Sequence, residues 1–280
     1  MPKPEPSRRR SSSRRDPRWT RHATVLALAI ALAFAFWRSR MEWTPDMRLW
    51  RAIGDAAFVL LALALATGPM ATLWPRTRRL LAWRRSFGVM AALVAALHAY
   101  LVWDGWALWS LRRLFGFQDL SEAGGPDDVL VDPGFGLANL MGIVALAWAL
   151  VIAATSSDHA LRLLGQRSWK FVQQFAYLVF YLPGLHAAYF LFLHYALGLV
   201  NLVFRKPVPE PNWFQASFVL IVAVVLVLQA AAFVHQVRRD RLIHGKRWPE
   251  SPAGRPTDPR GANETAPEAL DPAGSGPAQP

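Results

Sequence analysis

The chain of 280 residues contains no cysteine. This absence excludes disulfide bonds, cysteine-ligated zinc, iron–sulfur clusters held by cysteine and covalent haem attachment through a Cys-x-x-Cys-His motif. A metal or cofactor would have to be bound non-covalently by histidine, methionine or carboxylate side chains. The seven histidines are therefore the first residues to consider for a functional site.

Charged residues are scarce as well. They make up 18% of the chain, whereas 53% of the residues are hydrophobic, and the mean hydropathy is +0.19. A window of about 20 apolar residues is enough to cross a bilayer core about 30 Å thick. The sequence therefore predicts an all-α, polytopic, six-helix transmembrane bundle in contact with membrane lipid. Its apolar segments are expected at 22–37, 52–74, 86–110, 134–157, 171–200 and 213–236.

Both ends of the chain differ in composition from this bundle. Residues 1–21 are basic and rich in serine and proline, and residues 247–280 are dense in proline, alanine and glycine. Such segments bury too little apolar surface to fold, so we expect two disordered tails around a transmembrane domain at 22–246. The first apolar segment is short and has small-x-small triplets, so a cleaved signal peptide is the alternative to a first span.

The net charge of +12 does not indicate nucleic-acid binding. Arginine and lysine gather in the N-terminal tail and in alternate connections between apolar segments, which is the distribution of a topology signal. The connection at 119–132 is acidic. This bias predicts a multi-pass protein of the bacterial cytoplasmic (inner) membrane with both termini in the cytoplasm.

Three histidines lie inside apolar segments. His186 and His194 belong to "YLPGLHAAYFLFLHY", in a region without charged side chains, and His98 belongs to "AALVAALHAYLVW". Small residues flank His98 and His186, which leaves clearance for a large planar group, whereas His194 has bulky neighbours. The remaining four occur in basic flanks or at helix ends, where an interfacial position is the ordinary one: His22, His159, His235 and His244.

His98 and His186 are expected to form a pair. They occur at similar depths in two helices that run in the same direction, so one imidazole could face each side of a haem iron. A buried polar group without a partner costs about 2–7 kcal/mol, and ionisable residues inside membranes are commonly functional. Two other interpretations remain open: histidines packed against a polar group of another helix, and a proton relay, which the position of Asp55 and Asp104 near segment ends disfavours. His194 is the weaker alternative as a ligand.

Three stretches of the chain carry a pattern of several spaced residues, and no single short motif: "ALATGPMATLWP", "PRTRRLLAWRRSFGVMAALVAALHAYLVW" and "VIAATSSDHALRLLGQRSWKFVQQFAYLVFYLPGLHAAY". The last has Thr-Ser near its start, then Leu-Gly, then Arg, Trp and Tyr before His186. Together they resemble the ferric-reductase-like transmembrane domains, and most closely the MsrQ (YedZ) group of bacterial haem-binding subunits. The resemblance covers about residues 50–240.

This resemblance implies a six-helix bundle that binds b-type haem, with His98 and His186 as iron ligands. The family pattern places a further histidine four residues after the tryptophan, where this chain has Gln173. An amide oxygen is a poor iron ligand beside imidazole, so we expect one haem and no second one near Gln173. His159, His22 or His235 would be needed as substitutes for a second haem.

The resemblance also implies an electron-transfer role in an oxidoreductase system. Family members carry electrons from a quinol or a cytosolic flavin reductase to an extracytoplasmic acceptor, which for the MsrQ group is an oxidoreductase that repairs oxidised methionine. The chain has no Gly-x-Gly-x-x-Gly motif and no soluble domain for a dinucleotide, although a bound flavin or quinone is compatible with it. The alternative function is a polytopic carrier or scaffold whose intramembrane histidines are pathway or packing residues.

Overall fold

The computed structural model describes residues 18–119, 121, 129–130, 133–194 and 212–245. The chain divides into two units, Met1–Val237 and Arg238–Pro280, and the candidate site lies in the first. Most of both predicted tails lies outside the described residues. The N-terminal prediction is wrong for residues 18–21, because they form the first turn of a helix.

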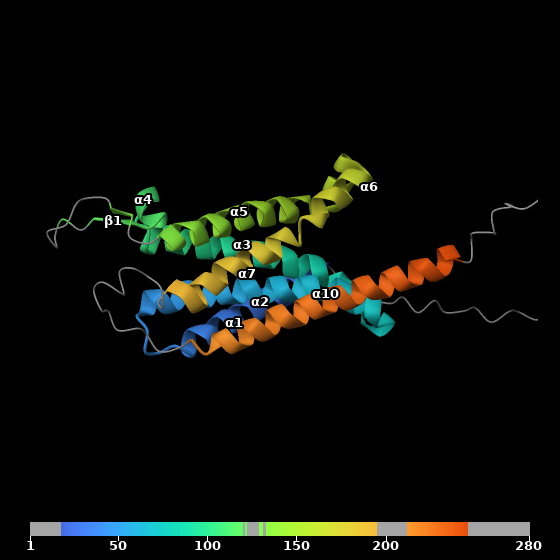
Figure 1. Ribbon diagram of the computed structural model, residues 1–280, viewed down its shortest axis with the longest axis horizontal. Coiled ribbons are helices and arrows are strands. Elements are labelled where there is room, and N and C mark those ends of the chain that lie inside the picture. The colour runs from blue at the N-terminus through green and yellow to red at the C-terminus, as the bar shows by residue number, and fades with distance from the viewer. Residues whose placement is uncertain (1–17, 120, 122–128, 131–132, 195–211, 246–280) are drawn as a thin grey trace, which may run out of the picture. The chain divides into compact units, whose positions relative to one another are not determined.

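The described residues contain six helical segments that are long and apolar enough to cross a membrane, which confirms the predicted fold class. Many large apolar side chains on them are exposed, as is normal for helices that face lipid. Within the first unit, Figure 1 shows long helices that run along one another. The six segments are Trp19–Arg38, Pro45–Leu73, Pro75–Gly105, Gly134–Thr155, Asp158–Leu193 and Phe214–Leu242.

Short elements interrupt or connect these segments. A small antiparallel ladder pairs Phe117 with Leu130 and Gln118 with Val129. In chain order the elements are α1 (Arg18–Arg38), α2 (Pro45–Leu73), the 3-10 helix η1 (Pro75–Leu80), α3 (Leu81–Gly105), α4 (Leu111–Leu114), β1 (Phe117–Gln118), β2 (Val129–Leu130), α5 (Pro133–Thr155), α6 (Asp158–Gln174), α7 (Leu178–Ala188), the π-helix η3 (Tyr189–Leu193) and α10 (Phe214–Gly245).

Two helix ends differ from the sequence prediction. Helix α2 begins at Pro45, with Asp46 in its first turn; both residues favour a helix N-terminus. Asp55 therefore lies well inside α2, and its predicted position near a segment end was wrong. Helix α3 ends at Gly105 and not at residue 110, because Leu108 has a φ of 50° and takes the chain out of the helix.

The fifth segment is longer and more broken than predicted. It begins at Asp158, where the Ser157 hydroxyl accepts a hydrogen bond of 2.9 Å from the Ala160 N–H and caps α6. Gly165 kinks α6 with a φ of 73°. The helix α7 continues through Pro183. The interruptions lie on either side, at 175–177 and in the π-helix η3.

Aromatic side chains join the helices in a buried core. Phe58 of α2 stacks on Phe180 of α7, with ring centroids 5.7 Å apart. Phe58 also meets Phe218 of α10 at 5.0 Å. A second cluster joins α1, α2 and α3 around Leu60 and Met90. Packing on both sides of α2 fixes the register of this helix, which forms one wall of the cavity described next.

Candidate functional site

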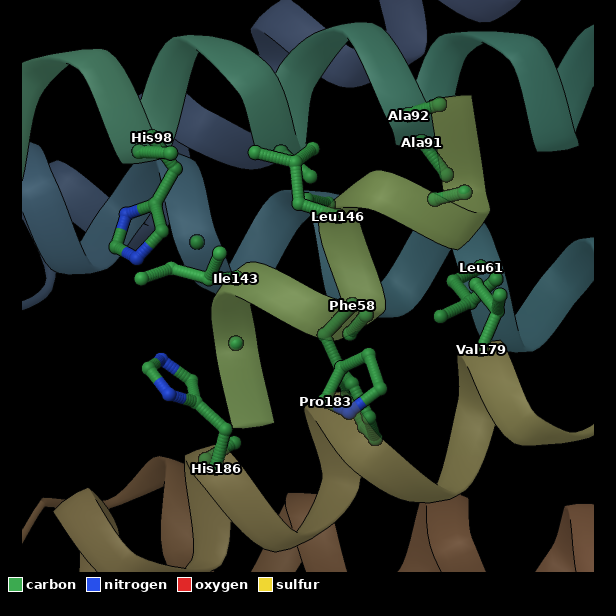
Figure 2. Close-up of a pocket in the computed structure, with 18 of the residues that line it drawn as sticks. Phe58, Leu61, Ala91, Ala92, His98, Ile143, Leu146, Val179, Pro183 and His186 are labelled. Carbon is green, nitrogen blue, oxygen red and sulfur yellow. The ribbon is translucent and has the colours of Figure 1, made fainter. Parts of the chain in front are cut away.

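A cavity of about 990 Å³ lies inside the bundle, between α2, α3, α5, α6 and α7. Figure 2 shows part of it, with His98 and His186 at one side and apolar side chains such as Phe58 and Leu146 along its length. His194 also lines it. The opposite end is lined by polar side chains, among them Gln173. The cavity thus connects the two regions that the sequence singled out.

His98 projects from α3 toward α2. Its Nδ1 lies 2.8 Å from the carbonyl oxygen of Trp50. Because a carbonyl oxygen only accepts hydrogen bonds, Nδ1 carries the hydrogen and donates it. In the neutral ring, Nε2 then keeps its lone pair, which is the form that ligates metals. The ring packs against Gly54, where an added Cβ would lie 3.0 Å from Cε1 of His98.

His186 has the same arrangement on the other side of the cavity. It projects from α7 toward α5, and its Nδ1 donates to the carbonyl oxygen of Ala138 at 2.8 Å. The ring packs against Gly142, where an added Cβ would lie 2.9 Å from Nδ1. Such a second hydrogen bond fixes the tautomer and orientation of metal-binding histidines in many proteins.

The two rings approach each other across the cavity. Their centroids are 6.5 Å apart and their planes make an angle of 78°, and Figure 2 shows them pointing toward one another. A metal–imidazole bond is about 2 Å long and the ring centre lies about 1.2 Å behind the nitrogen, so two imidazoles on opposite sides of one metal have centres about 6.4 Å apart. The observed separation fits this arrangement.

In the described residues, the side chains placed to ligate one metal at this site are the two imidazoles of His98 and His186. Among the described residues, no group of three or more His, Asp or Glu side chains could hold a metal ion. Two nitrogens fill two coordination positions, which is what a haem requires of its axial ligands. The residues present therefore fit a haem better than a free ion.

His194, the weaker alternative ligand, lies beyond the π-helix η3. Its ring contacts aromatic side chains, with centroids 5.3 Å from Phe135 and 5.5 Å from Phe190. His194 thus packs among aromatic rings, whereas His98 and His186 face each other with a carbonyl acceptor behind each ring. Within the described residues, the histidines that line the cavity are these three.

Gln173 lies at the opposite end of the cavity. Its Nε2 donates to the Thr155 hydroxyl at 3.3 Å, and Trp169 Nε1 donates to the Thr155 carbonyl oxygen at 2.9 Å. Three cationic side chains line this end: Arg84, Arg85 and Lys170. His22, His159 and His235, the substitutes considered for a second haem, are not among the described residues that line the cavity.

Sequence reasoning missed the residues behind and beside the histidines. Gly54 and Gly142 carry no signal of chemistry, yet each lets an imidazole approach a helix backbone. Arg51 and Asn139 also line the cavity. Asp55 does too, and it forms a buried ion pair with Arg40. The common spacing of Gly54 and Gly142 before His98 and His186 is the one signal that could have revealed this arrangement.

Comparison with known proteins gives distant similarity. No family model matches the chain. It is 27% identical over 155 residues to the protein-methionine-sulfoxide reductase heme-binding subunit MsrQ of Polaromonas naphthalenivorans, which covers 55% of this chain and 64% of the relative. It is 29% identical over 138 residues to the magnetosome protein MamZ of Paramagnetospirillum magneticum, covering 49% of this chain and 19% of that protein. The match spans less than two thirds of either relative. The resemblance to the MsrQ group thus holds as distant homology over about half of the chain.

Proposed function

We propose that this protein is a membrane electron-transfer subunit that binds one b-type haem between His98 and His186. The observation that carries the proposal is the pair of imidazoles whose ring centroids lie 6.5 Å apart. The Nδ1 of each ring donates a hydrogen bond to a backbone carbonyl oxygen. Similarity to a protein described as a heme-binding subunit supports it. A haem ligated by two histidines supplies one-electron transfer.

The chain's own part in this function is binding and orientation. The Trp50 and Ala138 carbonyl oxygens accept hydrogen bonds from Nδ1 and hold the two rings in place. The lone pair of each Nε2 then stays available for a metal. Second hydrogen bonds of this kind also raise the basicity of the ligating nitrogen. The apolar lining, which includes Phe58, keeps water from the site and thereby tunes its reduction potential.

The proposal also indicates the class of the electron donor and of the electron acceptor. We infer that electrons cross the membrane to an extracytoplasmic oxidoreductase, as the resemblance to the MsrQ group implies. Gln173 at the far end of the cavity argues for a single haem on the side of His98 and His186. A membrane quinol can reach such a site laterally, so we propose a quinol as donor in preference to a cytosolic flavin reductase.

Single substitutions test the ligand assignment. His98→Ala and His186→Ala should each abolish the low-spin haem spectrum of protein purified from haem-replete cells, because each removes one axial nitrogen. His194→Ala is the matched control, since it also removes an imidazole from the cavity lining, and it should leave the spectrum nearly unchanged. Size-exclusion profiles of all three variants report folding.

Added imidazole separates loss of a ligand from loss of the fold. In His98→Gly and His186→Gly, free imidazole should restore the low-spin spectrum by filling the space of the missing ring. Loss of haem in His194→Ala with retention in His186→Ala would show that the wrong histidine of this segment was chosen. A carrier or scaffold predicts colourless protein in every case.

A further inference from the structure

A second, smaller cavity lies beside the cavity of the histidine pair, and we call it the side cavity. It has a volume of about 270 Å³. Clefts that bind drug-sized ligands measure about 300–1,000 Å³, so the side cavity has the size for a single ring and not for a haem. Its lining includes Leu65 and Pro69 of α2, Arg84 of α3, Tyr177 just before α7, and Gln229 and Phe233 of α10.

The side cavity and the cavity of the histidine pair share a wall. Leu65, Arg84 and Tyr177 line both cavities. Arg84 precedes His98 by fourteen residues on α3, which corresponds to about 21 Å along a helix, so the shared wall lies toward the end of the cavity away from the two imidazoles. A ligand in the side cavity would therefore lie next to the space that extends to the haem.

The outer wall of the side cavity belongs to a helix that faces lipid. Phe233 of α10 is 69% exposed, and it lies in the candidate span Phe214–Leu242. Large apolar side chains are exposed on such a helix because acyl chains cover them. A compound dissolved in the bilayer can therefore approach the side cavity from the lipid without passing through water.

Gln229 brings a polar side chain to this cavity. The Tyr181 hydroxyl donates to its Oε1 at 3.3 Å. Its Nε2 is buried and has no hydrogen-bond partner among the described residues. A buried donor without an acceptor costs about 1–3 kcal/mol. An acceptor on a ligand in the side cavity would offset this cost.

Helix α2 brings an acceptor to the same cavity. Pro69 lies inside this helix and has no backbone N–H, so the Leu65 carbonyl oxygen lacks the donor that residue 69 would otherwise supply. Leu65 and Pro69 both line the side cavity. A backbone oxygen without its donor is costly inside a membrane span unless another group satisfies it. A hydroxyl group of a ligand would do so.

We propose that the side cavity is the binding site of the quinol that reduces the haem. The Leu65 carbonyl oxygen accepts a hydrogen bond from one quinol hydroxyl, and the Gln229 amide donates to the oxygen of the other. This inference rests on the proposed function and names the site of its electron donor. A hydroxyl group both donates and accepts, so a quinol matches a wall with an acceptor and a donor. A lipid phosphate at neutral pH has no proton to donate to Leu65.

Arg84 borders both cavities, and its charge assists the reaction. A fixed positive charge stabilises the negative charge that develops on the quinol oxygen as its proton leaves. Oxidation of one quinol to the quinone releases two electrons and two protons. The single haem takes up the electrons one at a time, changing from ferric to ferrous twice, and the acceptor reoxidises it in between. The two protons pass to water.

The kinetics of haem reduction test the site. Full-length, haem-loaded protein is mixed anaerobically with decylubiquinol or menadiol, and the visible spectrum gives the rate at each quinol concentration. The concentration for the half-maximal rate should rise about two- to tenfold in Gln229→Leu and in Pro69→Ala, since each removes one hydrogen bond. Pro69→Ala also favours the helix, so a purely structural role of Pro69 predicts no loss. Reduction by dithionite and the haem spectrum should stay unchanged.

Gln166→Leu is the matched control, because Gln166 is an exposed glutamine of α6 outside the lining of both cavities. It should keep the wild-type concentration for the half-maximal rate. Unchanged values in Gln229→Leu and Pro69→Ala would overturn the site. The same conclusion would follow if neither quinol reduced a wild-type haem that dithionite reduces.

Two further outcomes are distinguishable from these. Wild-type protein that contains no haem would refute the proposed function itself. Loss of bound phospholipid from Gln229→Leu, with unchanged quinol kinetics, would identify a lipid site and contradict the inference. If Gln229→Leu does not accumulate, Pro69→Ala decides: a raised concentration for the half-maximal rate supports the site, and an unchanged one contradicts it.

Discussion

The carbonyl oxygens that His98 and His186 reach each lie four residues before a glycine. In an α-helix the Cα–Cβ bonds tilt toward the N-terminus, so the side chain four residues later covers a carbonyl oxygen. At Gly54 and Gly142 this cover is missing. Each glycine therefore lets an imidazole donate a hydrogen bond to a backbone carbonyl oxygen of the helix.

At the residue scale, this predicts a large effect of a single methyl group. In Gly142→Ala the new Cβ would lie 2.9 Å from Nδ1 of His186, which forces the ring away from the Ala138 carbonyl. We expect haem affinity to fall about tenfold or more, the usual cost of losing such a supporting contact. Titration with haem, followed by the visible spectrum, measures it.

The matched control for this prediction is Gly184→Ala. Gly184 is also a glycine of a membrane-spanning helix and lies two residues from His186, but an added Cβ meets no atom within 4 Å. Its haem affinity should equal that of the wild-type protein. Wild-type affinity in Gly142→Ala would show that the carbonyl contact is unimportant for binding.

The sequence revealed part of this site for identifiable reasons. His98 and His186 stand out because imidazoles are unusual in charge-free segments and because both have small neighbours. The Trp50 and Ala138 acceptors could not be found, since they are backbone atoms and any residue has them. Their contact with a ring depends on how α2 and α5 are registered against α3 and α7, which is a property of packing.

At the scale of elements, the fifth segment shows what apolar patterning misses. Arg162, Arg167 and Lys170 led to a predicted start at residue 171, yet α6 begins at Asp158. The basic side chains occupy an amphipathic helix, and their charges do not end it. The π-helix η3 follows His186 closely, beginning at Tyr189. Such bulges often occur at functional sites, but no residue pattern in this segment indicates one.

The sequence interval between His98 and His186 makes a prediction for the other end of the cavity. Gln173 of α6 and Arg85 of α3 are separated by the same interval as His186 and His98, and both line the cavity. The wild-type protein should contain one haem per chain. The combined substitution Arg85→His and Gln173→His should supply a second pair of axial nitrogens and raise the count toward two in a pyridine haemochrome assay.

Each single substitution serves as a control for this pair. One histidine alone gives a single axial ligand, so neither variant should reach two low-spin haems. Two haems in the wild-type protein, with one lost on changing His159, His22 or His235, would refute both the single-haem count and the argument from the equal sequence interval.

At the scale of the whole molecule, the six candidate spans of the described residues were predicted because charge-free windows of bilayer length are typical of membrane-spanning helices. Their orientation is a separate prediction from the arginine bias. Reporter fusions after Gly125 should be active outside the cytoplasm, and fusions after Ala82 only inside it, because arginine-rich connections stay in the cytoplasm. The reverse pattern at either position would invert the inferred direction of electron transfer.

The central claim is that one haem is held between His98 and His186, and the electron paramagnetic resonance spectrum of the oxidised wild-type protein tests it most directly. The Nδ1 of each imidazole donates a hydrogen bond to a carbonyl oxygen, and the two ring centroids lie 6.5 Å apart. This arrangement predicts a low-spin ferric signal of the bis-histidine type. Its integrated intensity should correspond to one spin per chain. A purely high-spin haem signal, or no haem signal from protein purified out of haem-replete cells, would contradict the claim.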